Sequence, residues 1–282
     1  MAKIIDGKAV SASVRADLCE KTKKFKEENG YVPGLAVVIV GDDPASKIYV
    51  RNKKKACEEI GYNSFEYALS AETTEEELLL LIDKLNADKN VHGILVQSPV
   101  PKHIDEKKVQ LRILPQKDVD AFHPVNVGKI MIGDYDFVPC TPAGITELLD
   151  FYGIETCGKE CVVIGRSDIV GKPMAMLMLH KNSTVTICHS RTKNLSEVTK
   201  KADIVIAAVG KADFLYGDMI KDGAVVIDVG MNRNAEGKLC GDANFDSCEK
   251  KASYITPVPG GVGPMTITML MKNTLKAAEI QK

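Results

Sequence analysis

Short runs of apolar residues rich in valine and isoleucine recur through the second half of the chain. These runs cover residues 161–164, 184–188, 204–209, 225–229 and 254–256. Runs of this length and composition predict β-strands, and strands that are apolar throughout are typical of a parallel sheet covered on both faces. The pattern therefore predicts an α/β domain over residues 143–264, built on a Rossmann-like doubly wound parallel sheet.

The first half of the chain carries a second α/β pattern. Strands are expected at residues 35–40 and 91–96, with helices between and around them. Thr74 and Glu77 have the spacing of a capping box, which starts an amphipathic helix. We therefore expect a separate domain over residues 1–142, and the fold class is α/β with two α/β domains.

Two further helices determine how these domains are joined. Residues 141–152 are expected to form a bridging helix, with Thr141 as its cap and Pro142 at its first position. The sequence PVPGGVGP at 257–264 is expected to be irregular, and the helix at 265–282 beyond it is apolar on one face. We expect that last helix to join the first domain, and a cleft between the two domains to hold the chemistry.

Composition narrows the class of ligand. The chain has 282 residues, enough for two domains, and its 37 basic and 38 acidic residues leave a net charge of −1. Such a balance offers nothing to attract a nucleic acid or an anionic membrane. The eight cysteines include no C-x-x-C pair, and the chain has neither a signal-peptide layout nor an apolar run of membrane-spanning length. We expect a cytoplasmic protein with a small-molecule substrate.

A glycine-containing turn follows the apolar run at residues 161–164. Gly165 ends that run, and Gly171 stands at the expected start of the next helix. Glycines at such a turn let the backbone bend sharply and approach a pyrophosphate, while the helix N-terminus offers N–H donors. The spacing is G-x-S-x-x-x-G rather than G-x-G-x-x-G, so the prediction of a dinucleotide site depends on the strand before it and the helix after it.

The end of the next predicted strand indicates which dinucleotide binds. An NAD-binding domain places an acidic residue there to hold the ribose 2′-hydroxyl, whereas this chain has His189, Ser190 and Arg191. A hydroxyl and a guanidinium suit a 2′-phosphate, and Arg166 in the glycine turn is a candidate for a further bidentate contact. NADP is therefore favoured as the cofactor, with a solvated loop position for Arg191 as the alternative.

A candidate acid/base pair lies in the first domain. Tyr49 and Lys53 stand one turn apart in a predicted helix, so their phenol and ammonium groups can reach the same molecule. A lysine shuttles protons near neutral pH only if burial or neighbouring cations, here Lys54 and Lys55, lower its pKa. The alternative is that this run of lysines forms a solvated helix face.

Polar residues also stand where strands are expected to end. Gln97 follows the apolar run at 91–96, so its amide is expected at the carboxyl edge of the sheet, where ligands bind. Asp118 and Asp120 alternate along the chain, so one is expected to face the cleft and the other to bind local backbone or solvent. A carboxylate in the cleft can accept two parallel hydrogen bonds from an amino-pyrimidinone ring. The five histidines show no metal-binding spacing, so no metal is expected.

Seven motifs follow one another between about residues 35 and 275. They are Y-x-x-x-K at Tyr49 and Lys53, then VQSPVP, KDVDAFHP, PCTPAG, GRSDIVGKP, CHSRT and PGGVGPMT. In this order they resemble the bifunctional methylenetetrahydrofolate dehydrogenase/cyclohydrolases, the FolD family. The resemblance implies NADP-dependent oxidation of 5,10-methylenetetrahydrofolate to the methenyl form and its hydrolysis to 10-formyltetrahydrofolate, in one-carbon metabolism and purine biosynthesis.

The resemblance also implies roles for individual residues. Lys53 matches the general acid/base lysine, and Gln97 supports it by hydrogen bonding. Tyr49 lines the folate, and Asp120 holds the pterin ring. The further positions implied are the NADP contacts Gly165, Arg166, Ser167, Ser190 and Met231, which join Gly171 and Arg191 of the turns, and the cleft-floor residues Gly260, Gly261 and Thr266.

One departure from the family and two alternative functions stand beside this interpretation. Ala121 occupies a position where the family commonly has glycine, so a positive φ there would cost stability without removing a functional group. Another NADP oxidoreductase of the same domain order, similar to shikimate dehydrogenases, would also accept Ser190 and Arg191, although the clustered glycines of that family are missing. A non-catalytic dinucleotide sensor would need neither Lys53 nor Gln97. The FolD resemblance further implies a homodimer.

Overall fold

The computed structural model describes residues 1–234 and 236–282. The chain forms two compact units. Unit 1 consists of Met1–Ala12 and Pro139–Thr266, and unit 2 consists of Ser13–Val138 and Ile267–Lys282. Two helices, α1 (Gly7–Asn29) and α10 (Val262–Ile280), begin in unit 1 and continue into unit 2.

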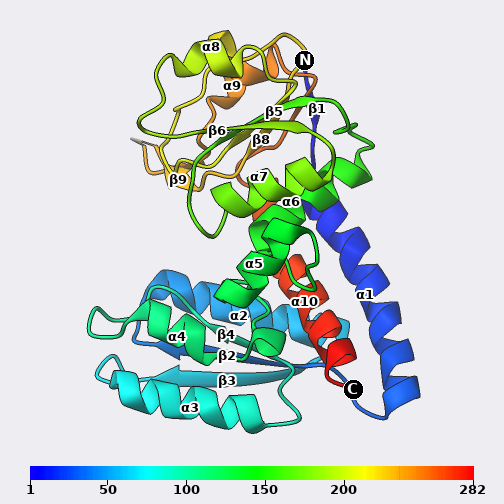
Figure 1. The fold of residues 1–282 in the computed structure, drawn as a ribbon, viewed down its shortest axis with the longest axis vertical. Helices are drawn as coiled ribbons and strands as arrows, with labels where there is room; N and C mark the ends of the chain where they lie inside the picture. The colour runs from blue at the N-terminus through cyan, green and yellow to red at the C-terminus, as the bar shows by residue number, and fades with distance from the viewer. Residues whose placement is uncertain (235) are drawn as a thin grey trace. The chain divides into compact units, whose positions relative to one another are not determined.

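Unit 1 is built on a parallel sheet of six strands in the order β1-β11-β8-β7-β5-β6. The strands are β1 (Lys3–Ile4), β5 (Glu160–Ile164), β6 (Thr184–Cys188), β7 (Ile204–Ala207), β8 (Val225–Asp228) and β11 (Tyr254–Ile255). The other elements are α6 (Cys140–Phe151), α7 (Gly171–His180), α8 (Leu195–Thr199), η2 (Gly217–Met219), α9 (Phe245–Glu249) and the hairpin of β9 (Asn232–Arg233) and β10 (Leu239–Cys240). Figure 1 shows α6 and α7 on one side of this sheet and α8 and α9 on the other.

The burial of the strands follows from their place in this sheet. Strands β7 and β8 are buried along their whole length, whereas most of the edge strand β6 is exposed or half-buried. One face of the inner strands packs against α8 and α9 in a single apolar cluster. The predicted doubly wound parallel sheet is confirmed, and helices cover both of its faces.

The N-terminus lies in unit 1, a difference from the expected first domain over residues 1–142. Lys3 and Ile4 pair in parallel register with Tyr254 and Ile255, which adds β1 as an edge strand to the six-stranded sheet. A two-residue strand carries almost no periodic signal, so its long-range partner could not be read from the sequence.

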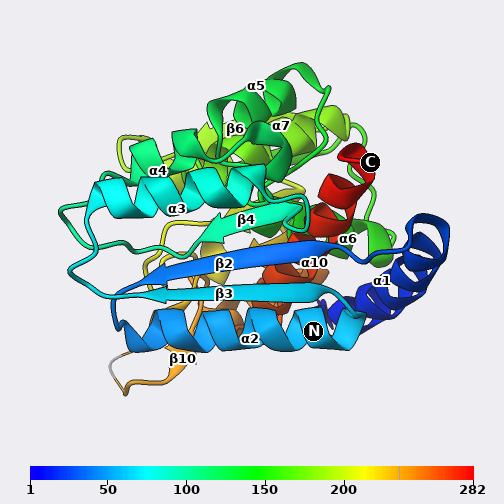
Figure 2. The ribbon, with the colours of Figure 1, turned by 90° about the horizontal axis from the view of Figure 1, so that it is seen from below.

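Unit 2 is built on a parallel sheet of three strands in the order β3-β2-β4. Its elements are β2 (Gly34–Val40), α2 (Pro44–Ile60), β3 (Asn63–Leu69), α3 (Glu75–Ala87), β4 (Gly93–Val96), α4 (Glu106–Arg112), η1 (Pro115–Lys117) and α5 (Pro124–Ile132), with the C-terminal parts of α1 and α10. Alternate residues of β2 pack against α3 and α4. Helix α2 contacts both β2 and β3. Figure 2 shows it beside β3, away from α3, which lies beside β4.

Two helix starts differ from the sequence prediction. Helix α6 begins at Cys140, so Thr141 lies inside the helix and the predicted threonine cap is wrong. Helix α10 begins at Val262, so the end of the glycine- and proline-rich segment is helical rather than irregular. Pro264 is accommodated because the N–H groups of the first turn have no partner within the helix. The capping box predicted at Thr74 and Glu77 is confirmed.

Candidate active site

Gly165 and Gly171 shape the turn between β5 and α7. Gly165 has a φ of 134°, and a Cβ at this residue would lie 2.3 Å from the carbonyl oxygen of Ala208. A Cβ on Gly171 would lie 2.3 Å from the carbonyl oxygen of Gly165. Only glycine fits at either position, so the backbone packs closely against itself and against the residue after β7. Such a turn leaves room for a pyrophosphate beside the start of α7.

Ser167 and Arg166 lie in this turn and are placed differently. The Ser167 hydroxyl oxygen accepts hydrogen bonds from the backbone N–H groups of Val170 and Gly171, both at 3.2 Å. The serine thus holds the start of α7. The Arg166 side chain is exposed beside it. The turn therefore combines a fixed backbone with an exposed guanidinium, which suits an anionic ligand.

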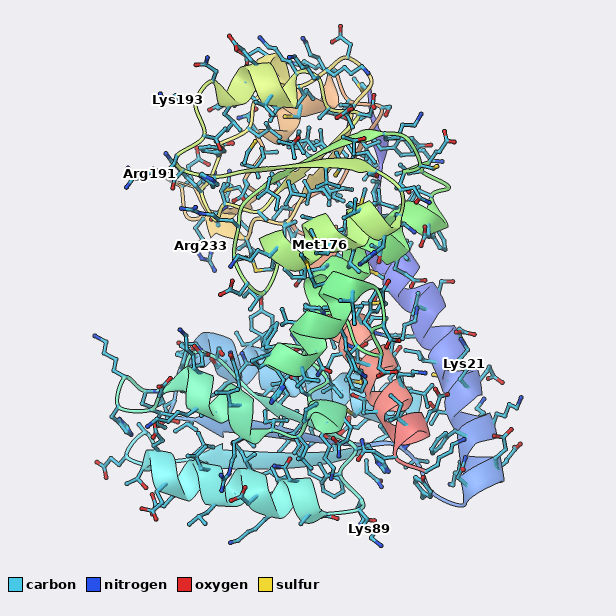
Figure 3. The ribbon with its side chains drawn as sticks, viewed as in Figure 1. Lys21, Lys89, Met176, Arg191, Lys193 and Arg233 are labelled. Carbon is cyan, nitrogen blue, oxygen red and sulfur yellow. The ribbon has the colours of Figure 1, made fainter. Side chains whose placement is uncertain are left out.

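Residues 189–192 form a second turn, after β6. The His189 N–H donates to Thr192 Oγ1 at 2.8 Å, and the Arg191 N–H donates to His189 Nδ1 at 3.1 Å. His189 is thus a structural residue whose ring nitrogen accepts a backbone hydrogen bond. Ser190 and Arg191 have exposed side chains, and Figure 3 shows Arg191 at the outer edge of unit 1. The hydroxyl and the guanidinium are presented together by one rigid turn.

The strand order places these turns at one edge of the sheet. Strand β5 lies between β6 and β7, so the chain changes direction across the sheet at β5 and β7. In doubly wound sheets, ligands bind beyond the carboxyl ends of the strands at this switch point. The turns after β5 and β6 lie at those ends, and Met231, which follows β8, lies at the same edge with 56% of its surface exposed.

Gly260 and Gly261 lie between β11 and α10 and pack against the start of α1. Gly260 has a φ of 110°, and a Cβ on Gly7 would lie 1.7 Å from the Gly261 carbonyl oxygen. Thr266, on α10, has its hydroxyl 3.3 Å from that of Thr141. The glycines are thus explained by close backbone packing within unit 1. Contact of these three residues with folate stays a prediction.

A buried lysine, Lys53, and a half-buried amide, Gln97, form a side-chain pair in unit 2. Lys53, on α2, is only 8% exposed, and its Nζ donates to Gln97 Oε1 at 2.6 Å. Gln97 follows β4, and its backbone N–H still donates to the Val38 carbonyl at 2.8 Å. Its side-chain Nε2 donates to the Ser98 carbonyl at 2.7 Å, which fixes the amide with its oxygen toward the lysine. The alternative of a solvated Lys53 is wrong.

Lys54 and Lys55, which follow Lys53 on α2, are exposed. Lys54 forms an ion pair with Glu66 of β3 at 3.0 Å, so its charge has a carboxylate partner. The expected contribution of Lys54 to the environment of Lys53 is therefore weakened, and burial is what distinguishes Lys53. Tyr49, one turn earlier, is 39% exposed.

Asp118 and Asp120 differ in how far they are buried, while the expected placement of one of them in the cleft stays a prediction. Asp118 is buried, and its Oδ2 accepts the His123 N–H and the Asn126 side-chain amide, both at 2.8 Å. Burial raises the pKa of Asp118, and these donors partly offset that rise. Asp118 and Asp120 both line a small cavity of unit 2, together with Ser98 and with residues of β4 and α4. The hydrogen bonds of Asp118 thus hold the loop. Contact of Asp120 with a ligand stays a prediction.

Ala121, next to Asp120, has a φ of 59°, in the left-handed region. A side chain in this conformation is strained relative to glycine, which explains why glycine suits the position. Ala121 nevertheless adopts this conformation, so the loop carries the strain that the positive φ implies.

Three buried polar residues, one in unit 2 and two in unit 1, were not predicted from the sequence. Asn273 of α10 donates from Nδ2 to the carbonyl oxygens of Val119 and Val138, at 2.8 and 2.9 Å, and so fixes the loop beside Asp120. An asparagine in an apolar helix was the available signal. Asp228 and Asp242 are buried in unit 1. The available signal for Asp228 was its place at the end of an apolar run, and Asp242 had no local signal.

Two general features complete the description. Among residues 1–234 and 236–282, no group of three or more His, Cys, Asp or Glu side chains is placed to hold a metal ion. In the same described part of the chain, no helix is both long and apolar enough to cross a membrane. The eight cysteines are free thiols.

A doubly wound sheet with a glycine turn, and a second α/β unit with a buried lysine hydrogen-bonded to an amide, are typical of a dinucleotide-dependent enzyme. Two family models cover most of the chain: the catalytic domain of tetrahydrofolate dehydrogenase/cyclohydrolase at residues 5–120 and its NAD(P)-binding domain at residues 139–282. The chain belongs to the tetrahydrofolate dehydrogenase/cyclohydrolase family.

Individual relatives agree with this assignment. The bifunctional protein FolD of Acetivibrio thermocellus is 62% identical over 280 residues, which cover 99% of this chain and 98% of the relative. Among solved structures, FolD of Campylobacter jejuni matches with a TM-score of 0.96 at 49% identity, over all of both chains. FolD of Trypanosoma brucei, solved with NADP and an inhibitor, matches with a TM-score of 0.94 at 41% identity, over 99% and 98% of the two chains.

These findings confirm the predicted family, the α/β fold, the enzyme class of an NADP-dependent dehydrogenase and cyclohydrolase, and NADP as the cofactor. The alternatives are not favoured. Shikimate dehydrogenase of Aquifex aeolicus shares only the fold, at 15% identity with a TM-score of 0.52. The individual site residues and the cleft between the units stay predictions.

Proposed function

We propose that this chain oxidises 5,10-methylenetetrahydrofolate with NADP and hydrolyses the methenyl product, with Lys53 moving the protons of the second reaction. The observation that carries this proposal is the 2.6 Å hydrogen bond from the buried Lys53 to the half-buried Gln97. A buried, oriented amine is what general acid/base catalysis needs, because its reach and protonation can be matched to one bound molecule.

Unit 1 supports the oxidation by binding and positioning. NADP supplies the acceptor for the hydride that leaves the methylene carbon. The turn requires glycine at both positions, since a Cβ on either would collide with backbone, and a glycine turn between a strand and a helix is the usual pyrophosphate site of such a sheet. Arg166, Ser190 and Arg191 have exposed side chains suited to the 2′-phosphate, and Met231 lies at the same sheet edge. Little further chemistry is required, because hydride transfer depends chiefly on orientation.

Unit 2 supports the hydrolysis through side chains. Water adds to the methenyl carbon and a carbon–nitrogen bond of the ring opens, so a proton must leave the water and another must reach a ring nitrogen. Lys53 is the proposed carrier, and Gln97 holds its Nζ in place. Asp120 is the proposed partner of the pterin ring, and the exposed face of Tyr49 the proposed folate contact.

The remaining predictions concern the setting. We infer a cytoplasmic homodimer, which the family resemblance implies and which a gel-filtration or light-scattering measurement tests directly. A monomer at working concentration would rule out the dimer and leave the assignment of the activities intact.

A spectrophotometric assay tests the proposed function. Purified protein is mixed with 5,10-methylenetetrahydrofolate and either NADP or NAD, and separately with the methenyl compound alone. We expect reduction of NADP with a higher kcat/KM than NAD, and decay of the methenyl absorbance faster than in buffer. Absence of both reactions would refute the proposal, and oxidation without hydrolysis would refute the role of Lys53.

A further inference from the structure

Two aspartates are buried in unit 1 beneath the loops that follow β7 and β8. Asp228, the last residue of β8, is 3% exposed, and Asp242, in the segment after β10, is 0% exposed. Burying a carboxylate is costly unless hydrogen bonds compensate it. Burial raises the pKa of Asp228 to about 6, although backbone N–H groups counteract part of the rise. The free-energy cost of burying the two carboxylates must therefore be offset by the hydrogen bonds that they accept from backbone N–H groups.

Asp242 binds the loop after β7. Its Oδ2 accepts the backbone N–H groups of Val209 at 2.6 Å and Gly210 at 3.0 Å, and its Oδ1 accepts that of Lys211 at 2.9 Å. Three successive N–H groups that converge on one point form an anion-binding nest. An internal carboxylate fills this nest, so the loop has a fixed shape and its N–H groups are committed to Asp242.

Asp228 binds the segments on either side of that contact. Its Oδ1 accepts the N–H groups of Gly230 at 2.9 Å and Asp242 at 2.8 Å, and its Oδ2 accepts that of Ala243 at 2.8 Å. The approach is close, because a Cβ on Gly241 would lie 1.8 Å from Asp228 Oδ2 and a Cβ on Gly230 would lie 2.3 Å from Asp242 Oδ1. The two carboxylates and the surrounding backbone therefore form one packed unit.

The two aspartates and the backbone they bind adjoin two of the proposed cofactor contacts, Gly165 and Met231. The loop after β7 begins at Ala208, whose carbonyl oxygen stands against Gly165 of the glycine turn. Met231 lies between Gly230, held by Asp228, and Asn232, whose Nδ2 donates to Asp242 Oδ1 at 2.9 Å. A displacement of Asp242 would thus shift both the loop behind Gly165 and the segment that carries Met231.

We infer that Asp242 is a positioning residue for NADP binding, because its carboxylate fixes the loop behind Gly165 and the segment that carries Met231. The inference rests on the proposed cofactor site. Asp242 acts through the backbone it holds, since its carboxylate is fully buried and all of its described hydrogen bonds are internal.

Asp242→Asn tests this role, because an amide N–H₂ would face N–H donors on one side of the nest. We expect the KM for NADP to rise about tenfold or more, the size of effect that small misplacements produce. The hydrolysis of the methenyl compound consumes no NADP, so its rate reports whether the variant is folded. Asp203→Asn is the matched control, because Asp203 also accepts a backbone N–H, from Glu160 at 3.0 Å, but precedes β7 at the opposite edge of the sheet.

The inference is supported if the KM for NADP rises in Asp242→Asn and stays within twofold of wild type in Asp203→Asn. An unchanged KM in Asp242→Asn, or an equal rise in both variants, overturns it. If Asp242→Asn fails to fold, Asn232→Ala replaces it, because this variant removes only one hydrogen-bond donor to Asp242. A rise in its KM for NADP supports the inference, and an unchanged KM overturns it. Wild-type protein that reduces no NADP in the same assay would refute the proposed function instead.

Discussion

The glycine turn of unit 1 and the lysine pair of unit 2 solve different problems with different materials. The turn is made of backbone, since Gly165 and Gly171 are fixed by carbonyl groups that leave no room for a side chain. The lysine site is made of side chains, with an ammonium held by one amide in a buried place. Binding a cofactor needs shape and charge, whereas moving a proton needs one particular functional group.

This difference predicts how each region responds to substitution. In a site made of backbone, a substitution of glycine should cause a steric clash and lower the free energy of unfolding. Substitution of a charged side chain beside it should only weaken cofactor binding. A side-chain site should lose its reaction when one group is removed, with little effect on folding.

The largest expected effect is that of Lys53→Met. Methionine has a similar length and no proton to move, so hydrolysis of the methenyl compound should fall by about 10²- to 10⁴-fold. NADP binding, measured by calorimetry, should change little. Lys54→Met is the matched control, because Lys54 is paired with Glu66 and should tolerate the change. Hydrolysis retained in Lys53→Met would break the comparison.

Gly165→Ala should have the next largest effect, on stability. The new Cβ meets a carbonyl oxygen at 2.3 Å in a backbone with a φ of 134°, so the free energy of unfolding should fall by roughly 3 kcal/mol or more. Gly158→Ala is the control, since Gly158 has a φ of 71° and nothing within 4 Å of the added Cβ. It should lose only about 1 kcal/mol in denaturant titrations. Equal losses would show that the close approach is unimportant.

Arg191→Ala sharpens the comparison by testing charge without shape. Loss of a charge-assisted contact to the 2′-phosphate should raise the KM for NADP about tenfold and leave the KM for NAD nearly unchanged. Lys193→Ala supplies the control, because Lys193 is an exposed cation two residues along the same loop (Figure 3). An equal rise in the KM for NADP in both variants would show that the effect comes from net charge rather than from a contact of Arg191.

The smallest effect concerns pH and a buried histidine of unit 2. His92 Nδ1 accepts the Gly34 N–H at 3.0 Å, and burial, aided by Lys117, lowers the His92 pKa below its ordinary value near 6.5. The folded state keeps His92 neutral while the unfolded chain takes up a proton. Stability from this source is therefore present above about pH 6.5 and is lost as the pH falls below it.

His92→Asn can accept the same hydrogen bond without titrating. Between about pH 7 and pH 5 its free energy of unfolding should fall less than that of wild type, by on the order of 1 kcal/mol. Urea titrations at several pH values measure this difference. Identical slopes would mean that His92 keeps an ordinary pKa.

The sequence predicted those parts of the molecule whose signals are local. Strand β6 has the predicted bounds, because a run of β-branched residues stands between a turn and a histidine. Strand β3 was missed, because this edge strand has no buried position and polar residues such as Ser64 and the exposed Glu66 interrupt its apolar pattern. The start of α6 was misplaced, since Thr141 has a cap's identity and the tertiary context uses it otherwise.

The site shows the same division. Gln97 and Lys53 were singled out because each follows a recognisable pattern, a strand end and a helical spacing. The nest around Asp242 could not be foreseen, because its contacts join residues far apart in the chain, such as Asp242 and Val209. Long-range backbone contacts leave no periodic trace in a sequence.

The proposed mechanism depends on the Lys53 ammonium facing the folate carbon on which both reactions occur. A crystal structure with NADP and a folate analogue would show this contact. We expect Lys53 Nζ to keep its hydrogen bond to Gln97 and to lie within hydrogen-bond reach of the analogue or of a water held against it. If Lys53 turns toward bulk solvent in that complex, with no contact to either, its proposed role is wrong.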